Sequence, residues 1–168
     1  MSTHIASLLF HRKWILAVTL PILIAVWWAF RPEKLWINQK VNEAAPFASS
    51  SDAQPLYTGR LQGEAHRTSG RATIYKAANG TQYLRLTDFS TSNGPDVHVL
   101  LGRSNDENLK QEMVKGQLNS IELGSLKGNQ GDQNYGLPAS ANLQTYDAVV
   151  IYCQRFHAVF GVAKLEKF

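Results

Sequence analysis

Cysteine is nearly absent from this sequence: the 168 residues contain one, Cys153. A single thiol excludes an intrachain disulfide framework, a Cys-x-x-Cys redox pair, a zinc site built from several thiolates and Cys-x-x-Cys-His haem attachment. Any thiol chemistry of this chain must therefore start from Cys153 alone.

Charge is also sparse. Charged residues make up 18% of the chain and apolar residues 44%, whereas charged residues usually make up roughly 25%. The 17 lysines and arginines and the 13 acidic residues give a formal net charge of +4, and no long basic run concentrates it. These values argue against a disordered chain and against nucleic acid as a partner.

Local motifs of the common enzyme classes are missing. The sequence has no His-Glu-x-x-His, no phosphate-binding Gly-x-x-x-x-Gly-Lys and no dinucleotide-binding Gly-x-Gly-x-x-Gly. We expect Asp96 and His98 to make a poor acid–base pair, so a hydrolase is not predicted. Three oxygen-bearing side chains share a glycine-rich loop, and we expect them to shape a turn rather than to hold calcium: Asn129, Asp132 and Asn134. No metal site is predicted.

Long apolar runs are absent except for one near the amino terminus. Residues 14–30 read WILAVTLPILIAVWWAF and carry no charge. A spanning helix needs about 20 apolar residues, and about 17 is near the lower limit. The run therefore predicts a transmembrane anchor with the lipid bilayer as its partner. A cleaved secretory signal is the competing interpretation, which is disfavoured because no A-x-A pattern closely follows the run.

The remaining composition suggests how the chain is organised. We expect a short tail over 1–13, the anchor over 14–30, a juxtamembrane segment and linker over 31–55, and one domain over 56–168. Residues 42–55 (NEAAPFASSSDAQP) are small, polar and punctuated by proline, which is typical of a linker. An ordered arm around Phe47 is the alternative. An amino-terminal tail this short usually stays in the cytosol, so a single-pass protein with an extracytoplasmic domain, periplasmic or extracellular, is predicted.

Short apolar runs separated by turn signals indicate an all-β domain. Asn79-Gly80 lies between two alternating runs and predicts a hairpin with a type I′ turn. Expected strands are 71–77, 82–86, 97–101, 118–123, 149–153 and 157–165, with one short helix around 106–115. Strands at such spacing are typical of an antiparallel β-sandwich or barrel-like domain.

The strand that ends at Cys153 is apolar on both faces. Val149, Ile151 and Cys153 share one face, and Val150 and Tyr152 share the other. Such a strand should be central and well covered. A buried thiol behaves as a small hydrophobe and forms little thiolate. A reactive thiol must instead be accessible to its reactant. The residues alone leave both readings open.

Several stretches together resemble the DM-thirteen domain, also called the electron-transfer DM domain. They are GRATIY (70–75), LRLTDFSTSNGPDVHVLL (84–101), LGSLKGNQGDQNYGLP (123–138) and YDAVVIYCQRFHAVFGVAKL (146–165). The resemblance implies a β-rich extracytoplasmic domain with a redox role. It also implies that Cys153 acts as a free thiol or as a ligand to a prosthetic group such as haem. Asp96 matches the family pattern without an agreed role.

Two functions are therefore expected. The first is a membrane-anchored redox or electron-transfer module centred on Cys153, with a redox partner protein. The second is a non-catalytic interaction module whose contact surface is formed by the loops over 90–96 and 127–138, since loops on a rigid sheet commonly carry recognition. Its candidate residues are Asn93, Gly94, Asp96, Asp132, Asn134 and Tyr135.

Overall fold

The structure, a computed structural model, describes residues 15, 17–28, 37–47, 53–103 and 120–168. The chain divides into two compact units, Met1–Trp36 and Ile37–Phe168. The expected tail over 1–13 and the expected short helix around 106–115 lie outside the described residues.

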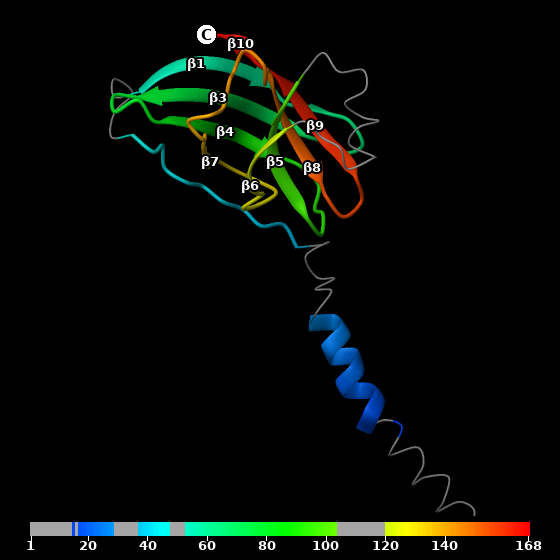
Figure 1. The fold of residues 1–168 in the computed structure, drawn as a ribbon. Helices are drawn as coiled ribbons and strands as arrows, with labels where there is room; N and C mark the ends of the chain where they lie inside the picture. The colour runs from blue at the N-terminus through cyan, green and yellow to red at the C-terminus, as the bar shows by residue number, and fades with distance from the viewer. Residues whose placement is uncertain (1–14, 16, 29–36, 48–52, 104–119) are drawn as a thin grey trace, which may run out of the picture. The chain divides into compact units, whose positions relative to one another are not determined.

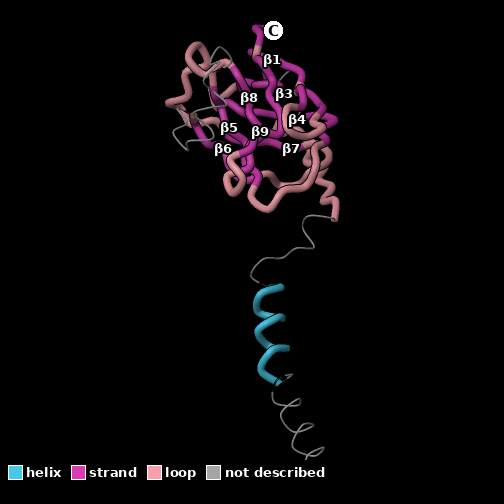
Figure 2. Tube along the Cα trace, turned by 90° about the vertical axis from the view of Figure 1, so that its right-hand side faces the viewer, coloured by secondary structure: helices cyan, strands magenta, loops and turns pink. Residues whose placement is uncertain are grey.

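The described part of the first unit is helical at residue 15 and over 17–28 (Figure 2). The hydroxyl of Thr19 donates a hydrogen bond to the carbonyl of Ile15 at 2.9 Å. Large apolar side chains of this helix are exposed, from 48% at Val26 to 79% at Trp28. Within the described parts of the chain, no helix combines the length and apolar character that a bilayer crossing requires. Residues 14, 16, 29 and 30 of the expected anchor are outside those parts.

The described residues of the second unit form two five-stranded sheets, and all of their strand pairings are antiparallel (Figure 1). The order of the first sheet is β10-β1-β3-β4-β7. Its strands are β1 (Ala53–Arg60), β3 (Ser69–Ala77), β4 (Gln82–Ser90), β7 (Gln133–Gly136) and β10 (Glu166–Lys167). The order of the second sheet is β2-β9-β8-β5-β6. Its strands are β2 (Gln62–Gly63), β5 (Val97–Gly102), β6 (Ile121–Ser125), β8 (Ala148–Cys153) and β9 (Ala158–Lys164).

One apolar cluster joins the two sheets into a sandwich-like fold. The first sheet contributes Ala72, Ile74, Leu84, Leu86, Phe89 and Tyr135. The second sheet contributes Val97, Val99, Leu101, Val149, Ile151, Cys153, Phe160 and Ala163. Burying apolar surface on one side of each sheet is the main stabilising term of such a fold. The prediction of an all-β domain with antiparallel sheets is confirmed.

Strand β8 is covered on both faces, as its sequence predicts. Val149, Ile151 and Cys153 face the shared cluster between the sheets. Val150 and Tyr152 belong to a second cluster on the other face of the sheet, with Leu100 and Val159. The strand pairs with β5 on one side and β9 on the other. Its continuous apolar sequence therefore reflects a central strand.

The predicted hairpin around Asn79-Gly80 is present, but its turn is of another type. A type I′ turn needs positive φ at both central residues. Gly80 has φ +86°, whereas Asn79 is not among the residues with positive φ. The amide of Gly80 donates to the carbonyl of Ala77 at 2.8 Å, and the amide of Ala77 donates to the carbonyl of Thr81 at 2.9 Å. This is the pattern of a longer loop that ends in a glycine bulge.

The structure describes two parts of the stretch expected to be a linker, residues 42–47 and 53–55. Strand β1 begins at Ala53, inside the expected linker. Residues 37–47, hereafter the arm, belong to the second unit and hydrogen-bond to it. The ring centroid of Phe47 lies 5.2 Å from that of Tyr75. The alternative of an ordered arm around Phe47 therefore fits the described residues, and the compact unit starts earlier than residue 56.

Candidate functional site

Cys153 is the residue that the sequence singles out, and the structure encloses it. It is a free cysteine with 0% exposure in the cluster between the sheets. Val97 of β5 and Ala158 of β9 are its strand partners on the two sides. Immediately after it, the amide of Gln154 donates to the carbonyl of Asp96 at 2.9 Å and closes the strand end. A thiol in such apolar surroundings forms little thiolate and meets no solvent-borne reactant in the native fold.

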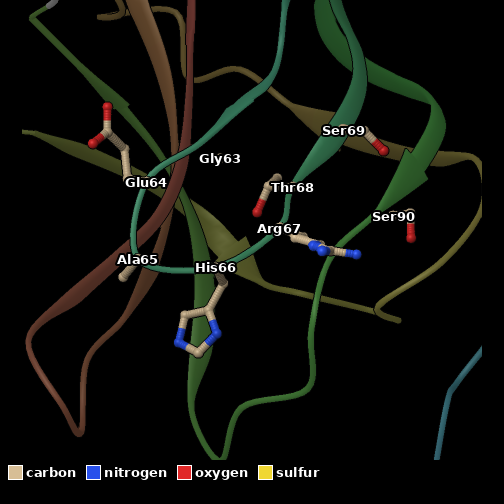
Figure 3. A pocket seen from close by; sticks show the side chains of 8 residues that line it. All are labelled: Gly63, Glu64, Ala65, His66, Arg67, Thr68, Ser69 and Ser90. Atoms are coloured by element: carbon tan, nitrogen blue, oxygen red, sulfur yellow. The ribbon is translucent and has the colours of Figure 1, made fainter.

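The surroundings of Cys153 do not fit haem ligation. A thiolate ligand needs an apolar slot beside the sulfur that admits the macrocycle. The described residues instead pack closed around Cys153, and neither of two surface hollows in the structure includes it. One hollow of about 700 Å³ is lined by residues 63–69 and Ser90 (Figure 3). In this hollow Glu64 and Arg67 point to different sides, so its polar groups do not converge on one ligand.

Polar side chains near Cys153 gather instead on the outer face of the second sheet. His98 of β5 lies between two carboxylates, with Nδ1 at 2.6 Å from Oε1 of Glu122 and Nε2 at 3.0 Å from Oδ1 of Asp96. Gln154 Nε2 donates to Glu122 Oε2 at 3.3 Å. Burial lowers the pKa of His98, but its hydrogen bonds to Asp96 and Glu122, and their charges, raise that pKa overall above 6.5.

The histidine between two carboxylates corrects the expectation for Asp96 and His98. Residues two apart on a strand share a face, and here they are hydrogen-bonded. Both ring nitrogens of His98 are engaged, which favours an imidazolium that links β5 to β6. No group of three or more metal-ligating residues occurs among the described residues, and these contacts leave neither nitrogen open to a metal ion.

A second histidine faces the phenol of Tyr152. The hydroxyl of Tyr152 lies 3.0 Å from Nδ1 of His157. Tyr152 is 6% exposed within the outer apolar cluster, and burial raises the pKa of its phenol. His157 is exposed at the turn between β8 and β9, with φ +49°. Tyr152 is also the strand partner of His98, so two histidines flank its position on the sheet.

The loop over 127–134, hereafter the docking loop, holds the arm as a parallel neighbour. The amide of Val41 donates to the carbonyl of Gln130, and the amide of Glu43 donates to the carbonyl of Asp132, each at 2.9 Å. The amide of Gln39 donates to Oδ1 of Asn129 at 2.7 Å. An extended segment of the same chain thus occupies the backbone edge that this loop offers.

Charged side chains strengthen the attachment of the arm. Lys127 Nζ lies 2.7 Å from Oε1 of Glu43, and the amide of Asn134 donates to Oε2 of Glu43 at 2.7 Å. Burial raises the pKa of Glu43, but these partners and the charge of Arg85 lower it overall. Arg85 donates to Asp132 at 2.6 Å, to Oδ1 of Asn134 at 2.8 Å and to the carbonyl of Glu43 at 3.1 Å. The arm is therefore held by a network of charge-assisted hydrogen bonds.

The shape of the docking loop depends on buried Gln133. Its Oε1 accepts from the amides of Lys127 and Gly128 and from the hydroxyl of Tyr135, at 3.1, 3.3 and 2.9 Å. Its Nε2 donates to the carbonyl of Gly128 at 2.8 Å. A side chain with 0% exposure that satisfies four partners fixes the loop without meeting a ligand. Tyr135 belongs to this scaffold.

The predicted loop residues thus do not form one surface. Asn93, Asp132 and Asn134 lie at the arm, where Asn93 Nδ2 donates to Oδ1 of Asn38 at 3.4 Å. Asp96 lies with His98 on the outer sheet face. Gly94 packs against Phe160, since a Cβ at Gly94 would come within 2.9 Å of that ring.

Several residues of these sites were not predicted from the sequence: Glu43, Arg85, His98, Glu122, Tyr152 and His157. The spacing of Asp96 and His98 could have indicated a pair on one strand face. The contact with Glu122 depends on the register of β5 and β6, which shifts between Val99 and Leu100. The contact with Glu43 joins segments that are far apart in the sequence, so no local sequence pattern predicts it.

A comparison with protein families matches residues 60–165 to the family described as Electron transfer DM13. The matched segment covers more than half of the chain and runs from the end of β1 to Leu165. Neither the curated proteins nor the solved structures give a match.

Proposed function

This chain belongs to the Electron transfer DM13 family, and we propose that its β domain passes single electrons at a membrane surface. The family match over residues 60–165 is the observation that carries the redox role. The match includes β3 to β9 and therefore both halves of the shared core. A closed sandwich suits electron transfer. An electron can pass from a donor to an acceptor across a short stretch of protein, and the donor and acceptor need not be in direct contact.

The enclosure of Cys153 decides between kinds of redox chemistry. Thiol–disulfide exchange needs a thiolate that reaches the sulfur of its partner, and oxidation to a sulfenic acid needs access by the oxidant. A sulfur with 0% exposure meets neither condition in the native fold. We therefore propose electron transfer rather than thiol exchange. The assignment of Cys153 as the redox centre stays a prediction, and the burial of its sulfur argues against it.

Display at a membrane is supported by the sequence. The uncharged run over 14–30, preceded by Arg12 and Lys13, has the composition of an anchor. The short tail before it favours an extracytoplasmic position for the domain. Fusing a reporter that is active only outside the cytoplasm to Phe168 tests this placement, and a reporter that works only in the cytoplasm would reverse it.

Kinetics with a one-electron acceptor test the proposed role. The full chain, in lipid nanodiscs, is mixed with a coloured inorganic one-electron acceptor, and the loss of its colour is followed by stopped flow. Because unfolding exposes the thiol of Cys153, which itself reduces such acceptors, the comparison uses the Cys153→Ser chain. We expect the folded variant to reduce the acceptor faster than the same variant unfolded in urea. Equal rates would contradict an electron-transfer role of the fold. Labelling with iodoacetamide before and after unfolding reports in parallel whether Cys153 can be reached.

The alternative of an interaction module has one specific observation in its favour. The docking loop already binds an extended peptide, the arm of its own chain. Because the arm occupies this surface, the predicted contact loop over 127–138 does not offer Asp132 and Asn134 freely to a partner. A fluorescent peptide with the sequence of residues 37–47, added in trans to the full chain, tests for exchange at this loop. Asp132→Ala should weaken any such binding, whereas Cys153→Ser should leave it intact.

A further inference from the structure

Tyr152 and His157 form a hydrogen-bonded phenol–imidazole pair where strand β8 turns into β9. The two heteroatoms are 3.0 Å apart. The turn fixes His157 in a left-handed conformation, φ +49°, which few non-glycine residues adopt. The amide of His157 lies 3.4 Å from the carbonyl of Gln154, which it faces across the turn. Because the phenol is buried and the imidazole is exposed, the pair connects the outer apolar cluster of the second sheet to solvent.

This pairing has a chemical consequence for oxidation. When a phenol loses one electron, its proton becomes strongly acidic and must leave at nearly the same time. An imidazole that already accepts the hydrogen bond can take that proton without any rearrangement. In the tautomer with the proton on Nε2, Nδ1 of His157 is that acceptor.

Tyr135 provides a contrast within the same domain, because it is also a buried tyrosine. Its hydroxyl donates to the amide oxygen of Gln133 at 2.9 Å, and a carboxamide does not take up the proton. The ammonium group of Lys127 lies 5.1 Å from its ring centroid, which disfavours a positive charge on that ring. Burial raises the pKa of both phenols, that of Tyr135 to about 12, so the contrast lies in the group that accepts the hydrogen bond. Proton loss is thus hindered at Tyr135 and assisted at Tyr152.

Two side chains next to Tyr152, those of His98 and Cys153, are not placed to take its proton. His98, the strand partner of Tyr152, already uses both nitrogens with Asp96 and Glu122. Cys153 follows Tyr152 in the chain but faces the opposite side of the sheet. All four tryptophans of the sequence precede Ile37, so tyrosine is the most readily oxidised aromatic residue type in the second unit.

We propose that Tyr152 and His157 are a proton-coupled electron-transfer pair and that Tyr152 is the electron donor of the domain. In the forward step, one electron leaves the phenol of Tyr152 for a one-electron oxidant, and the phenolic proton moves to Nδ1 of His157. The products are a neutral tyrosyl radical, an imidazolium and the reduced oxidant. A one-electron reductant then restores the phenol while the proton returns. This inference rests on the proposed electron-transfer role and names the residue that performs it.

Flash oxidation of the full chain tests the pair. A photo-oxidised ruthenium polypyridyl complex serves as the one-electron oxidant, and the tyrosyl radical is followed by transient absorption and by electron paramagnetic resonance. We expect the radical on Tyr152 in the wild-type chain, and its loss in Tyr152→Phe but not in the control Tyr135→Phe. The phenylalanine keeps the ring in the apolar cluster, and circular dichroism verifies the fold.

Variants at His157 separate proton transfer from a structural role. Asparagine and glycine both tolerate positive φ, so His157→Asn and His157→Gly keep the turn. We expect each to slow radical formation by about a hundredfold, the lower end of what a positioned proton acceptor contributes. Added imidazole should restore the rate in His157→Gly, because the position is exposed.

The outcomes distinguish a failure of the Tyr152–His157 pair from a failure of the proposed electron-transfer role of the domain. If the wild-type chain reduces acceptors and Tyr152→Phe does so at the same rate, the pair is refuted while the electron-transfer role stands. A radical that forms equally fast in His157→Asn, or that lies on another tyrosine, also refutes the pair. If the folded chain transfers electrons no better than the unfolded chain, both proposals fail.

Discussion

Gly131 lies where the docking loop meets the arm, and its replacement tests that contact. A Cβ at this position would meet the carbonyl oxygen of Val41 and would come within 2.6 Å of Oδ1 of Asn42. Gly131 also has φ +93°, so Gly131→Ala is strained for two separate reasons. Gly80 has a similar φ of +86° with nothing within 4 Å of its Cβ position. Gly80→Ala therefore supplies the backbone strain without the clash.

The expected loss in free energy of unfolding has two contributions, the backbone strain at positive φ and the clash with the arm. Left-handed backbone costs a non-glycine residue roughly 1–2 kcal/mol, and both variants bear this cost. In Gly131→Ala the arm must also move away. That movement breaks the hydrogen bonds from the amides of Val41 and Glu43, each at 2.9 Å. At about 0.5–1.5 kcal/mol for each bond, Gly131→Ala should lose about 1–3 kcal/mol more than Gly80→Ala.

Two measurements on the full chain check this difference. Urea unfolding gives the free energy of unfolding of both variants, and hydrogen exchange gives the protection of the amides of Val41 and Glu43. We expect faster exchange of both amides in Gly131→Ala only. Equal free energies of unfolding in the two variants, with unchanged protection of the arm, would refute the attachment described here.

Three further substitutions probe other contacts. Because the folded-state pKa of His98 lies above 6.5, its ion pairs stabilise the fold at low pH, and this contribution is lost as pH rises through the folded pKa. Urea unfolding across neutral pH should show that loss in the wild type, and His98→Gln should abolish it; an unchanged pH profile would contradict the pairing. Cys153→Ser places a hydroxyl in an apolar core and should lower the free energy of unfolding, measured by thermal unfolding, by about 1–3 kcal/mol. An unchanged free energy of unfolding, together with labelling of Cys153 in the folded wild type by iodoacetamide, would show that the thiol is accessible. Arg85→Lys should cost about 1.5–3 kcal/mol, because a single ammonium group does not reproduce the guanidinium fork that serves Asp132, Asn134 and the carbonyl of Glu43 together. The exposed control Arg71→Lys should change the free energy of unfolding little, and an equal loss in both variants would argue against the network.

Features that depend on neighbouring residues were predictable from the sequence. The apolar alternation on both faces of β8 predicted a central strand, and β8 lies between β5 and β9. Asn79-Gly80 predicted the hairpin of β3 and β4 but the wrong turn. Glycine alone supplies the positive φ there, and the loop is longer than the two-residue connection we expected. The strand pair at the end of the chain was confirmed for the same local reasons.

Features that depend on tertiary pairing were not predictable in this way. Strand β1 contains Pro55 and half-buried residues without a clear alternation, and it gains its place by pairing with β3 and β10. Strand β7 is only four residues long, QNYG, and mostly polar. It is held by its ladder with β4 and by the fit of Tyr135 into the core. Propensity is a weak guide for such strands, because their environment decides their structure.

The same distinction explains why the sequence pointed to Cys153 before Tyr152. Chemistry alone favours the thiol, since it is the most readily oxidised side chain in the motif Tyr-Cys-x-x-Phe over 152–156. The alternation of a strand sends adjacent residues to opposite faces, and only the assignment of those faces says which one meets a proton acceptor. The thiol faces the closed core, whereas the phenol faces the sheet surface and the imidazole of His157. Access for a proton, rather than ease of oxidation, therefore selects Tyr152 as the redox candidate.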